Sequence, residues 1–250
     1  MSKSLKILVV RFSSIGDIVL TTPVLRILKN QLNAEVHYLT KKEYSSILKN
    51  NPNINKLYSI ENSILELRKH LQKEKYDYVI DLHNNLRSSL LISLGFTVKR
   101  YVKSNFKKFL YRNIRINFLK NKHVVDRYLE TISFLNIKND EKGLEYYIDD
   151  QASVDFDLNQ KYIAWAIGGS QIQKKISANQ ITKISERLNS TIVLIGGEKE
   201  KPTGDLIKEN CNELVIKNFC GVLDLDQSAL IIEHLSLIHI SEPTRPRLIS

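Results

Sequence analysis

The sequence predicts an α/β protein with two parallel sheets, each covered by helices, and three observations support this fold class. Short runs of branched apolar residues, typical of buried strands, alternate with helical patterns over the first 82 residues. A polar segment around residues 149–160 interrupts the alternation, and the same pattern then restarts. Loops with glycines follow several predicted strands, at the strand ends where parallel sheets bind ligands.

The first half of the chain contains four strand patterns: Leu5–Val10, Val36–Leu39, Leu57–Ile60 and Tyr78–Leu82. Apolar residues recur at helical spacing over residues 18–28, and Pro23 lies about a turn inside this helix, where we expect a kink. Further helices are predicted at Lys42–Leu48, Ile64–Leu71 and 123–135, and an interrupted helix over the basic residues 99–127. Strands that alternate with helices in this way indicate a parallel sheet with helices on both faces.

The second half repeats the pattern with three strands and three helices, about half of a complete doubly wound domain. The strands are predicted at Tyr162–Ile167, Thr191–Ile195 and Leu214–Ile216. The helices are predicted at Ile181–Leu188, at Thr203–Asn210 and after Asp224, an N-cap candidate. Residues 236–250 hold two of the five prolines and continue neither period. This tail resembles a translated adapter sequence at the end of a truncated reading frame. We therefore expect domains at 1–150 and 160–235, the second incomplete, and a non-native tail at 236–250.

The composition, 42% hydrophobic and 26% charged, is that of an ordinary soluble globular protein. No apolar run approaches the ~18 residues that span a bilayer, and the N-terminus does not resemble a signal peptide. Cys211 and Cys220 have no metal or redox spacing, so we expect two reduced thiols, a cytoplasmic location and no metal.

The net charge is +10, and residues 99–127 hold ten Lys or Arg with interleaved aromatic residues. Such a stretch suits nucleic acid, anionic lipid or a phosphorylated substrate, or is a solvated helix face.

The turn "RFSSIGD" places Asp17 at the predicted start of a helix, after a strand and a single glycine. This carboxylate is either a helix N-cap or a general base at the mouth of a cleft. In "DLHNNLRS", His83 and Arg87 follow another strand, where they either contact an anionic sugar or belong to a capped helix start.

Two loops of the second half carry the other candidates. In "GGSQIQKK", Gly168 and Gly169 would let the backbone approach an anion, Ser170 adds a hydroxyl, and Lys174 or Lys175 could neutralise a diphosphate. A plain turn is the alternative. In "GGEKE", the carboxylate of Glu200 could hold a ribose diol, or is a solvated loop acid.

The order of these segments resembles one known family. The segments are "RFSSIGDIVLTTPVLRIL", "VIDLHNNLRSSLL", "HVVDRYL", "AIGGSQIQKK", "VLIGGEKEK" and "NFCGVLDLDQSALII". Together they look like glycosyltransferase family 9, the ADP-heptose:lipopolysaccharide heptosyltransferases, from about Lys6 to His234. The resemblance implies the GT-B arrangement of two Rossmann-like domains, with the acceptor bound by the first and the nucleotide sugar by the second.

The resemblance also implies roles for individual residues. Asp17 matches the proposed base, Lys174 and Ser170 match phosphate contacts, and Glu200 matches the acid that holds the donor ribose. For the acceptor we expect contacts from Ser14, His83, Arg87, Arg112 and Arg115. Ile176 and Ser177 replace the Trp-Pro of the family's "K-x-W-P" motif, and its "D-[ST]-G-x-x-H" segment is absent.

The sequence therefore predicts an inverting, metal-free transferase that needs no cofactor. It would move heptose from a nucleotide-diphosphate sugar, ADP-heptose, to the lipopolysaccharide inner core. An inactive shortened chain is the alternative outcome. Its expected partners are the donor, a phosphorylated glycolipid acceptor and the cytoplasmic face of the inner membrane, with no nucleic acid, and the chain is expected to be a monomer. The alternative is a non-enzymatic basic module that binds nucleic acid or anionic membrane.

Overall fold

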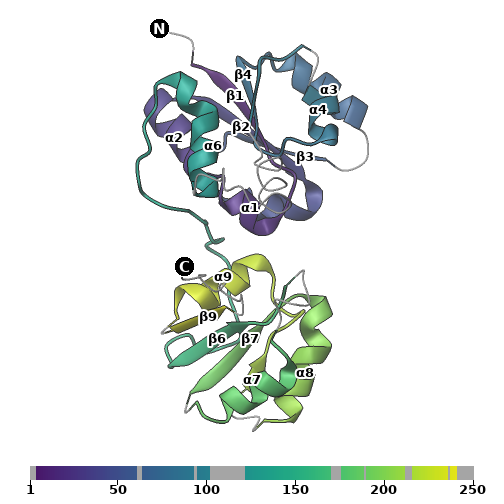
Figure 1. The fold of residues 1–250 in the computed structure, drawn as a ribbon, viewed down its shortest axis with the longest axis vertical. Coiled ribbons are helices and arrows are strands. Elements are labelled where there is room, and N and C mark those ends of the chain that lie inside the picture. Colours follow the sequence, from purple (N-terminus) through teal and green to yellow (C-terminus); the bar gives the residue numbers. More distant parts are fainter. Residues whose placement is uncertain are drawn as a thin grey trace, which may run out of the picture. The chain divides into compact units, whose positions relative to one another are not determined.

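The computed structural model describes residues 4–60, 64–92, 95–101, 122–169, 176–188, 190–211, 216–235 and 237–240. The chain divides into two compact units, Met1–Tyr147 (unit 1) and Ile148–Ser250 (unit 2). Each unit is built on a parallel sheet (Figure 1). The predicted fold class, α/β with two parallel sheets, is therefore confirmed.

The sheet of unit 1 has the order β3-β2-β1-β4-β5, with every neighbouring pair parallel. Its strands are β1 (Lys6–Val10), β2 (Glu35–Lys41), β3 (Lys56–Ile60), β4 (Tyr78–Asp81) and β5 (Val98–Arg100). The first four were predicted, but β5 was not, because two of its three residues are exposed and basic. This edge strand is held by its pairing with β4 and shows no apolar run of its own.

Helices cover both faces of this sheet, and Figure 1 shows α2 with α6 on one side and α3 with α4 on the other. The helical segments are α1 (Ile15–Val19), α2 (Thr22–Leu32), η1 (Lys42–Leu48), α3 (Ile64–Lys73), α4 (Leu86–Ile92), α6 (Val124–Ile132) and η2 (Ser133–Leu135). One kinked helix over residues 18–28 was wrong, because Pro23 lies in the first turn of α2. A proline there removes no intrahelical hydrogen bond, so it starts a helix instead of bending one.

Residues 138–147, called the strap below, pack along α2 and form the end of unit 1. Arg26 of α2, only 3% exposed, donates from Nε and Nη2 to the two carboxylate oxygens of Asp140, both at 2.7 Å. Its Nη1 lies 3.0 Å from Glu145, whose backbone N–H donates to Thr22 Oγ1 at 3.0 Å. The hydrogen bond to Arg26 lowers the pKa of Asp140. Because a buried guanidinium needs such partners, the strap and α2 form one packed layer.

The sheet of unit 2 has the order β8-β7-β6-β9. Its strands are β6 (Tyr162–Ala166), β7 (Thr191–Ile195), β8 (Ile216–Asn218) and β9 (Leu237–Ile240); its helical segments are α7 (Ala178–Ser185), η4 (Glu198–Glu200), α8 (Lys201–Glu209) and α9 (Leu225–Glu233). Asp224 caps α9 as predicted, since its carboxylate accepts the backbone N–H of Gln227 at 2.8 Å.

One prediction about unit 2 is corrected at the end of the chain. Residues 236–250 were expected to continue neither period, yet β9 lies within them and pairs in parallel with β6. An open strand edge offers a row of unpaired N–H and C=O groups, which a short apolar segment can satisfy. The sheet therefore has four strands instead of three. Within the ranges that the structure describes, no helix is both long and apolar enough to cross a membrane.

Candidate active site

The first candidate site lies where β1 and β4 of unit 1 end. The chain leaves β1 through Arg11–Ser14, and it leaves β4 through Leu82–Asn85. The backbone N–H of Leu82 donates to the carbonyl of Val10 at 3.0 Å, which holds the two exits side by side. This edge of a parallel sheet is where ligands bind in such folds.

Asp17 lies in the first turn of α1 and not at its N-cap, which is Ser14. Its Oδ2 atom accepts from the backbone N–H of Ser14 at 3.4 Å and from the Ser14 hydroxyl at 3.2 Å. The same oxygen lies 2.7 Å from Nη2 of Arg11. Among the described residues, no group contacts the other oxygen, Oδ1, within hydrogen-bond distance. The side chain of Asp17 is 39% exposed, so this oxygen can reach a ligand.

The side chain of Arg11, which is 10% exposed, forms an ion pair with Asp17. Its Nε donates to the carbonyl of Ser13 at 2.7 Å, and its Nη1 donates to the carbonyl of Leu82 at 2.8 Å. The guanidinium also lies over the ring of Tyr128 from α6, 5.9 Å from the ring centroid. Arg11 thus ties the carboxylate to both strand exits, and its fixed fork orients the carboxylate. The sequence did not single out Arg11, because a charged residue directly after a buried strand does not reveal which backbone carbonyls it binds.

A second carboxylate, Asp81 at the end of β4, is fully buried and organises the other exit. It accepts from the backbone N–H groups of His83 at 3.0 Å and Asn84 at 2.8 Å, and from the hydroxyl of Ser88 at 2.8 Å. This residue was also missed, because the last residue of an apolar strand reads as part of the strand. Its contacts shape the loop that leads into α4.

Of the other residues predicted for the site in unit 1, some lie at the same edge as Asp17 and others do not. Ser14 contacts Asp17, and the ring of His83 packs against Phe12, with centroids 4.9 Å apart, so both lie at this edge. Arg87 is exposed on α4. Arg112 and Arg115 lie outside the described residues. Burial raises the pKa of Tyr128 to about 12, so its hydroxyl stays protonated beside this site at neutral pH.

The second candidate site lies at the same kind of edge in unit 2, after β6 and β7. Glu200 in η4 accepts the backbone N–H of Gly197 at 3.2 Å through Oε2. A Cβ built on Gly168 would lie 3.7 Å from the same oxygen, so the two predicted residues are neighbours. Gly169 is exposed beside them, while Ser170, Lys174 and Lys175 fall outside the described residues.

Glycines let the backbone pack tightly under Glu200. A Cβ on Gly196 would lie 2.8 Å from Cβ of Glu200 and 3.1 Å from Sγ of Cys220. Gly221, which follows β8, has a φ of +70°, a conformation that side chains rarely adopt. Burial raises the pKa of the Cys220 thiol to about 12, so this cysteine supports the loop and is no nucleophile.

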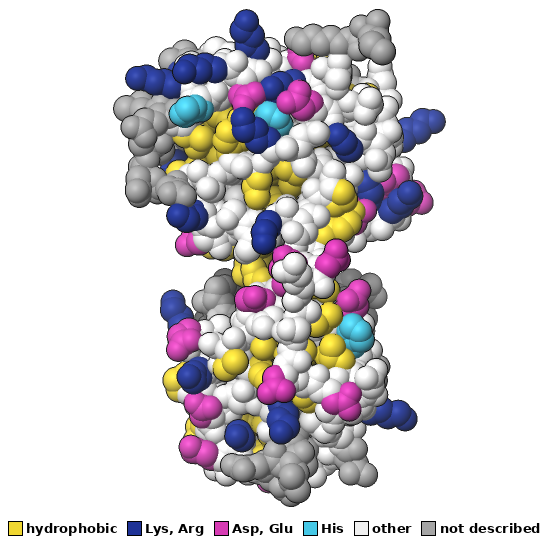
Figure 2. Space-filling model, turned by 180° about the vertical axis from the view of Figure 1, so that it is seen from behind, with side chains coloured by type: hydrophobic (Ala, Val, Ile, Leu, Met, Phe, Trp, Pro, Cys, Tyr) yellow, Lys and Arg dark blue, Asp and Glu magenta, His cyan; other side chains and the backbone are white. Residues whose placement is uncertain are grey.

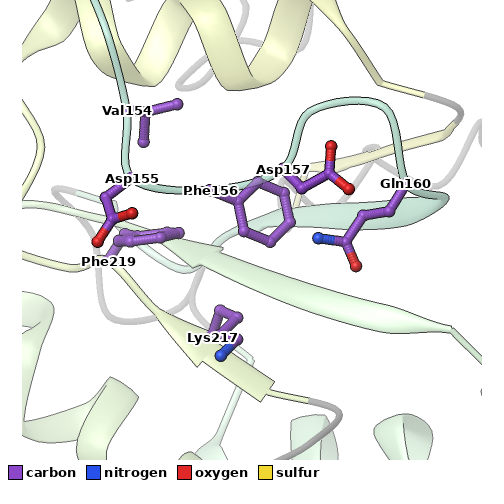
Figure 3. A pocket seen from close by; sticks show the side chains of 7 residues that line it. All are labelled: Val154, Asp155, Phe156, Asp157, Gln160, Lys217 and Phe219. Atoms are coloured by element: carbon purple, nitrogen blue, oxygen red, sulfur yellow. The ribbon is translucent and has the colours of Figure 1, made fainter.

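An open hollow of about 580 Å³ lies elsewhere in unit 2, between residues 154–160 and β8 (Figure 3). It is lined by Val154, Asp155, Phe156, Asp157, Gln160, Lys217 and Phe219. None of the predicted site residues lines it, and its charged side chains are exposed. In the described part of the chain, no three His, Cys, Asp or Glu side chains are grouped to hold a metal ion.

Both the sequence and the fold of this chain resemble those of known proteins. The sequence profile of glycosyltransferase family 9 (heptosyltransferase) matches residues 64–241. Lipopolysaccharide heptosyltransferase 1 of Campylobacter coli is 34% identical over 170 residues, which are 62% of this chain and 49% of that protein. Lipopolysaccharide heptosyltransferase 3 of Escherichia coli strain K12 is 38% identical over 88 residues, 31% of this chain and 26% of the relative. The chain thus spans half or less of the length of these curated relatives.

Solved structures show the same fold. A family 9 glycosyltransferase of Veillonella parvula superposes with a TM-score of 0.77 at 21% identity, covering 95% of this chain and 76% of that one. Heptosyltransferase II of Escherichia coli gives 0.71 at 18% identity, with 94% and 78% coverage. An Escherichia coli heptosyltransferase solved with ADP-2-deoxy-2-fluoro heptose gives 0.72 at 15% identity, with 94% and 82% coverage.

Proposed function

The chain belongs to glycosyltransferase family 9, the heptosyltransferases, and we propose that it serves the inverting transfer of heptose from ADP-heptose to the lipopolysaccharide inner core. The observation that carries this proposal is Asp17, whose Oδ2 is held by Arg11 and Ser14 while Oδ1 has no hydrogen-bond partner among the described residues, in a side chain that is 39% exposed. A carboxylate that is fixed through one oxygen and open at the other suits a general base.

In the proposed reaction, Asp17 Oδ1 accepts the proton of an acceptor hydroxyl. The hydroxyl oxygen forms a bond to the anomeric carbon of the heptose while the bond from that carbon to the diphosphate breaks. Attack from the face opposite the diphosphate inverts the anomeric centre, and ADP leaves with the bonding electrons. Arg11 keeps the carboxylate in place during the transfer, since it binds the strand exits as well as Asp17.

The donor would be bound by residues 160–235, which lie within unit 2, and the acceptor by residues 1–150. Glu200, beside the exposed Gly168 and Gly169, would accept hydrogen bonds from the ribose hydroxyls. By the family resemblance, Ser170 and Lys174 would stabilise the leaving diphosphate, an effect commonly worth a few kcal/mol per donor. The closeness of Glu200 to the glycine loop supports this assignment.

The acceptor would be a phosphorylated glycolipid at the cytoplasmic face of the inner membrane, contacted by Ser14, His83, Arg87, Arg112 and Arg115. Of these, Ser14 and His83 lie at the edge that carries Asp17. No metal or cofactor is required in this proposal, because the lysine ammonium would offset negative charge on the diphosphate, and the serine hydroxyl would donate a hydrogen bond to it, in place of a metal ion.

The test is transfer of heptose from ADP-heptose to a heptose-free inner-core acceptor by the chain and its Asp17→Asn variant. Loss of the base is expected to lower kcat by roughly 10²–10⁴-fold. Binding of ADP, measured by calorimetry, should be unchanged. The matched control is Asp155→Asn, an exposed carboxylate of unit 2 that lines the hollow. A kcat for Asp17→Asn within tenfold of the parent would show that the base has been assigned wrongly.

A further inference from the structure

Helix α4 turns two leucines outward beside the Asp17 edge. Leu86 is 85% exposed and Leu90 is 67% exposed, more than any other large hydrophobic side chain that the structure describes. The opposite side of the same helix buries Leu91 and Ile92 in the core of unit 1. Residues four apart lie on one helix face, so Leu86 and Leu90 form a single apolar ridge.

Basic groups flank this ridge. Arg87 is exposed between the two leucines in the sequence. Arg68 of α3 donates from Nη1 to the carbonyl of Leu90 at 3.4 Å, which fixes a second guanidinium at the end of the ridge. Figure 2 shows more broadly that hydrophobic side chains reach the surface of unit 1 among Lys and Arg side chains.

The charge of the sequence is concentrated in the segment that starts at this ridge. Residues 82–125 contain ten Lys or Arg and no Asp or Glu, whereas the remaining 206 residues contain 27 of each sign. The whole net charge of +10 therefore belongs to this one segment. The ridge itself combines two exposed leucines with the guanidinium groups of Arg87 and Arg68, and such a surface is complementary to a layer with an apolar interior and anionic headgroups.

We propose that the α4 ridge, formed by Leu86, Arg87, Leu90 and Arg68, docks on an anionic lipid bilayer and inserts its two leucines among the acyl chains. A soluble polyanion such as RNA would pair with the arginines but would leave the leucines in water. The bilayer satisfies both, because leaving water is favourable for the leucines and anionic headgroups attract the guanidinium groups.

The position of the ridge fits the proposed function, on which this inference rests. The carbonyl of Leu82, which binds Arg11 of the Asp17 cluster, lies only four residues before Leu86. Asp81 holds the intervening turn through two backbone N–H groups and Ser88 of α4. A bilayer touched by α4 would therefore lie close to the carboxylate that acts on a lipid-anchored acceptor.

The experiment is co-sedimentation of the chain with vesicles of phosphatidylcholine containing about one third phosphatidylglycerol, and with pure phosphatidylcholine. These vesicles hold neither acceptor nor donor, so the result does not depend on transfer. The parent chain should bind the anionic vesicles at least tenfold more tightly. The Leu86→Asn/Leu90→Asn variant should lose roughly tenfold or more, from the apolar area that stays in water. Arg87→Gln should lose about fivefold, the effect of one cation at the surface.

The matched control is Ile184→Asn/Leu206→Asn, which changes two exposed apolar residues of unit 2, 41% and 47% exposed, and should bind as the parent does. Binding to heparin should be equal for the parent and the leucine variant. The proposal is overturned if the parent does not bind anionic vesicles, or if the leucine variant binds them as tightly as the parent does. Asp17→Asn should bind vesicles normally, so a failed base assignment and a failed membrane surface give different results.

Discussion

Replacing Arg11 by Met should destabilise unit 1 far more than replacing Asp17, the residue it supports. The arginine is 10% exposed and has three bonded nitrogens, two of which bind the carbonyls of Ser13 and Leu82. Hydrogen bonds to a charged group are worth about 1.5–3 kcal/mol each and are not additive, so we expect a loss of about 2–4 kcal/mol. For a unit of this size, that lowers Tm by about 5–12 °C.

Asp17→Asn should cost less than about 1 kcal/mol, because the side chain of Asp17 is 39% exposed and its ion pair is screened by solvent. Arg11→Lys should fall between the two, since an ammonium group retains the charge but lacks the planar fork that reaches three acceptors. The order parent, Asp17→Asn, Arg11→Lys, Arg11→Met is therefore the expected order of decreasing stability.

Urea unfolding followed by far-ultraviolet circular dichroism measures these differences. The single tryptophan, Trp165, lies buried in β6 of unit 2, so its fluorescence provides an internal control that should not change in any of the three variants. If Asp17→Asn and Arg11→Met destabilise equally, the carbonyl contacts contribute nothing and the reasoning fails.

Four further predictions concern other residues of the chain. Gly16→Ala should leave the free energy of unfolding within about 0.5 kcal/mol of the parent, because a Cβ there meets nothing within 4 Å. In contrast, Gly204→Ala should unfold unit 2 earlier in a Trp165 fluorescence titration, because its Cβ would lie 2.3 Å from Oδ1 of Asn218. Asp140→Asn should be less stable than the parent at pH 7, because the lowered pKa of Asp140 adds stability above the ordinary Asp pKa of about 3.9. This contribution is lost as pH falls through the folded-state pKa, so the two proteins should converge in acid; a gap that is as large at pH 2 as at pH 7 would contradict the assignment. Iodoacetamide at pH 8 should label Cys211 and spare the buried Cys220, whose thiol pKa is raised to about 12, and peptide mass spectrometry would expose the opposite order.

The sequence predicted those parts of the fold that depend on apolar periodicity. The central strand β1, fully buried from Ile7 to Val10, is found within a residue of its predicted bounds because both of its faces need apolar side chains. Strand β5 was missed because two of its three residues are exposed and basic, so that its pairing with β4 leaves little trace in its sequence. Strand β9, a short apolar segment, was missed because residues 236–250 were interpreted as a non-native tail.

The residues of the two candidate sites could be predicted from the sequence to a similar extent. Asp17 and Glu200 follow strands beside glycines, which is a pattern that can be read in order along the chain. Arg11 and Asp81 could not be recognised in this way, because their importance lies in contacts to backbone atoms: the carbonyl of Leu82 for Arg11, and the N–H groups of His83 and Asn84 for Asp81. Backbone acceptors carry no sequence signature, so the residues that bind them become visible only in three dimensions.

The strap along α2 determines where family members can be recombined. A chimaera joined after η2, at Leu135, would give Arg26 a foreign partner in place of Asp140, Glu145 and the carbonyl of Gly143. Its buried guanidinium would then face the residues of the other parent sequence, and unit 1 would lose its own strap. A junction after Tyr147 keeps the strap with the helix it binds. First and second units from different relatives should therefore be exchanged at this point, well beyond the end of η2 at Leu135.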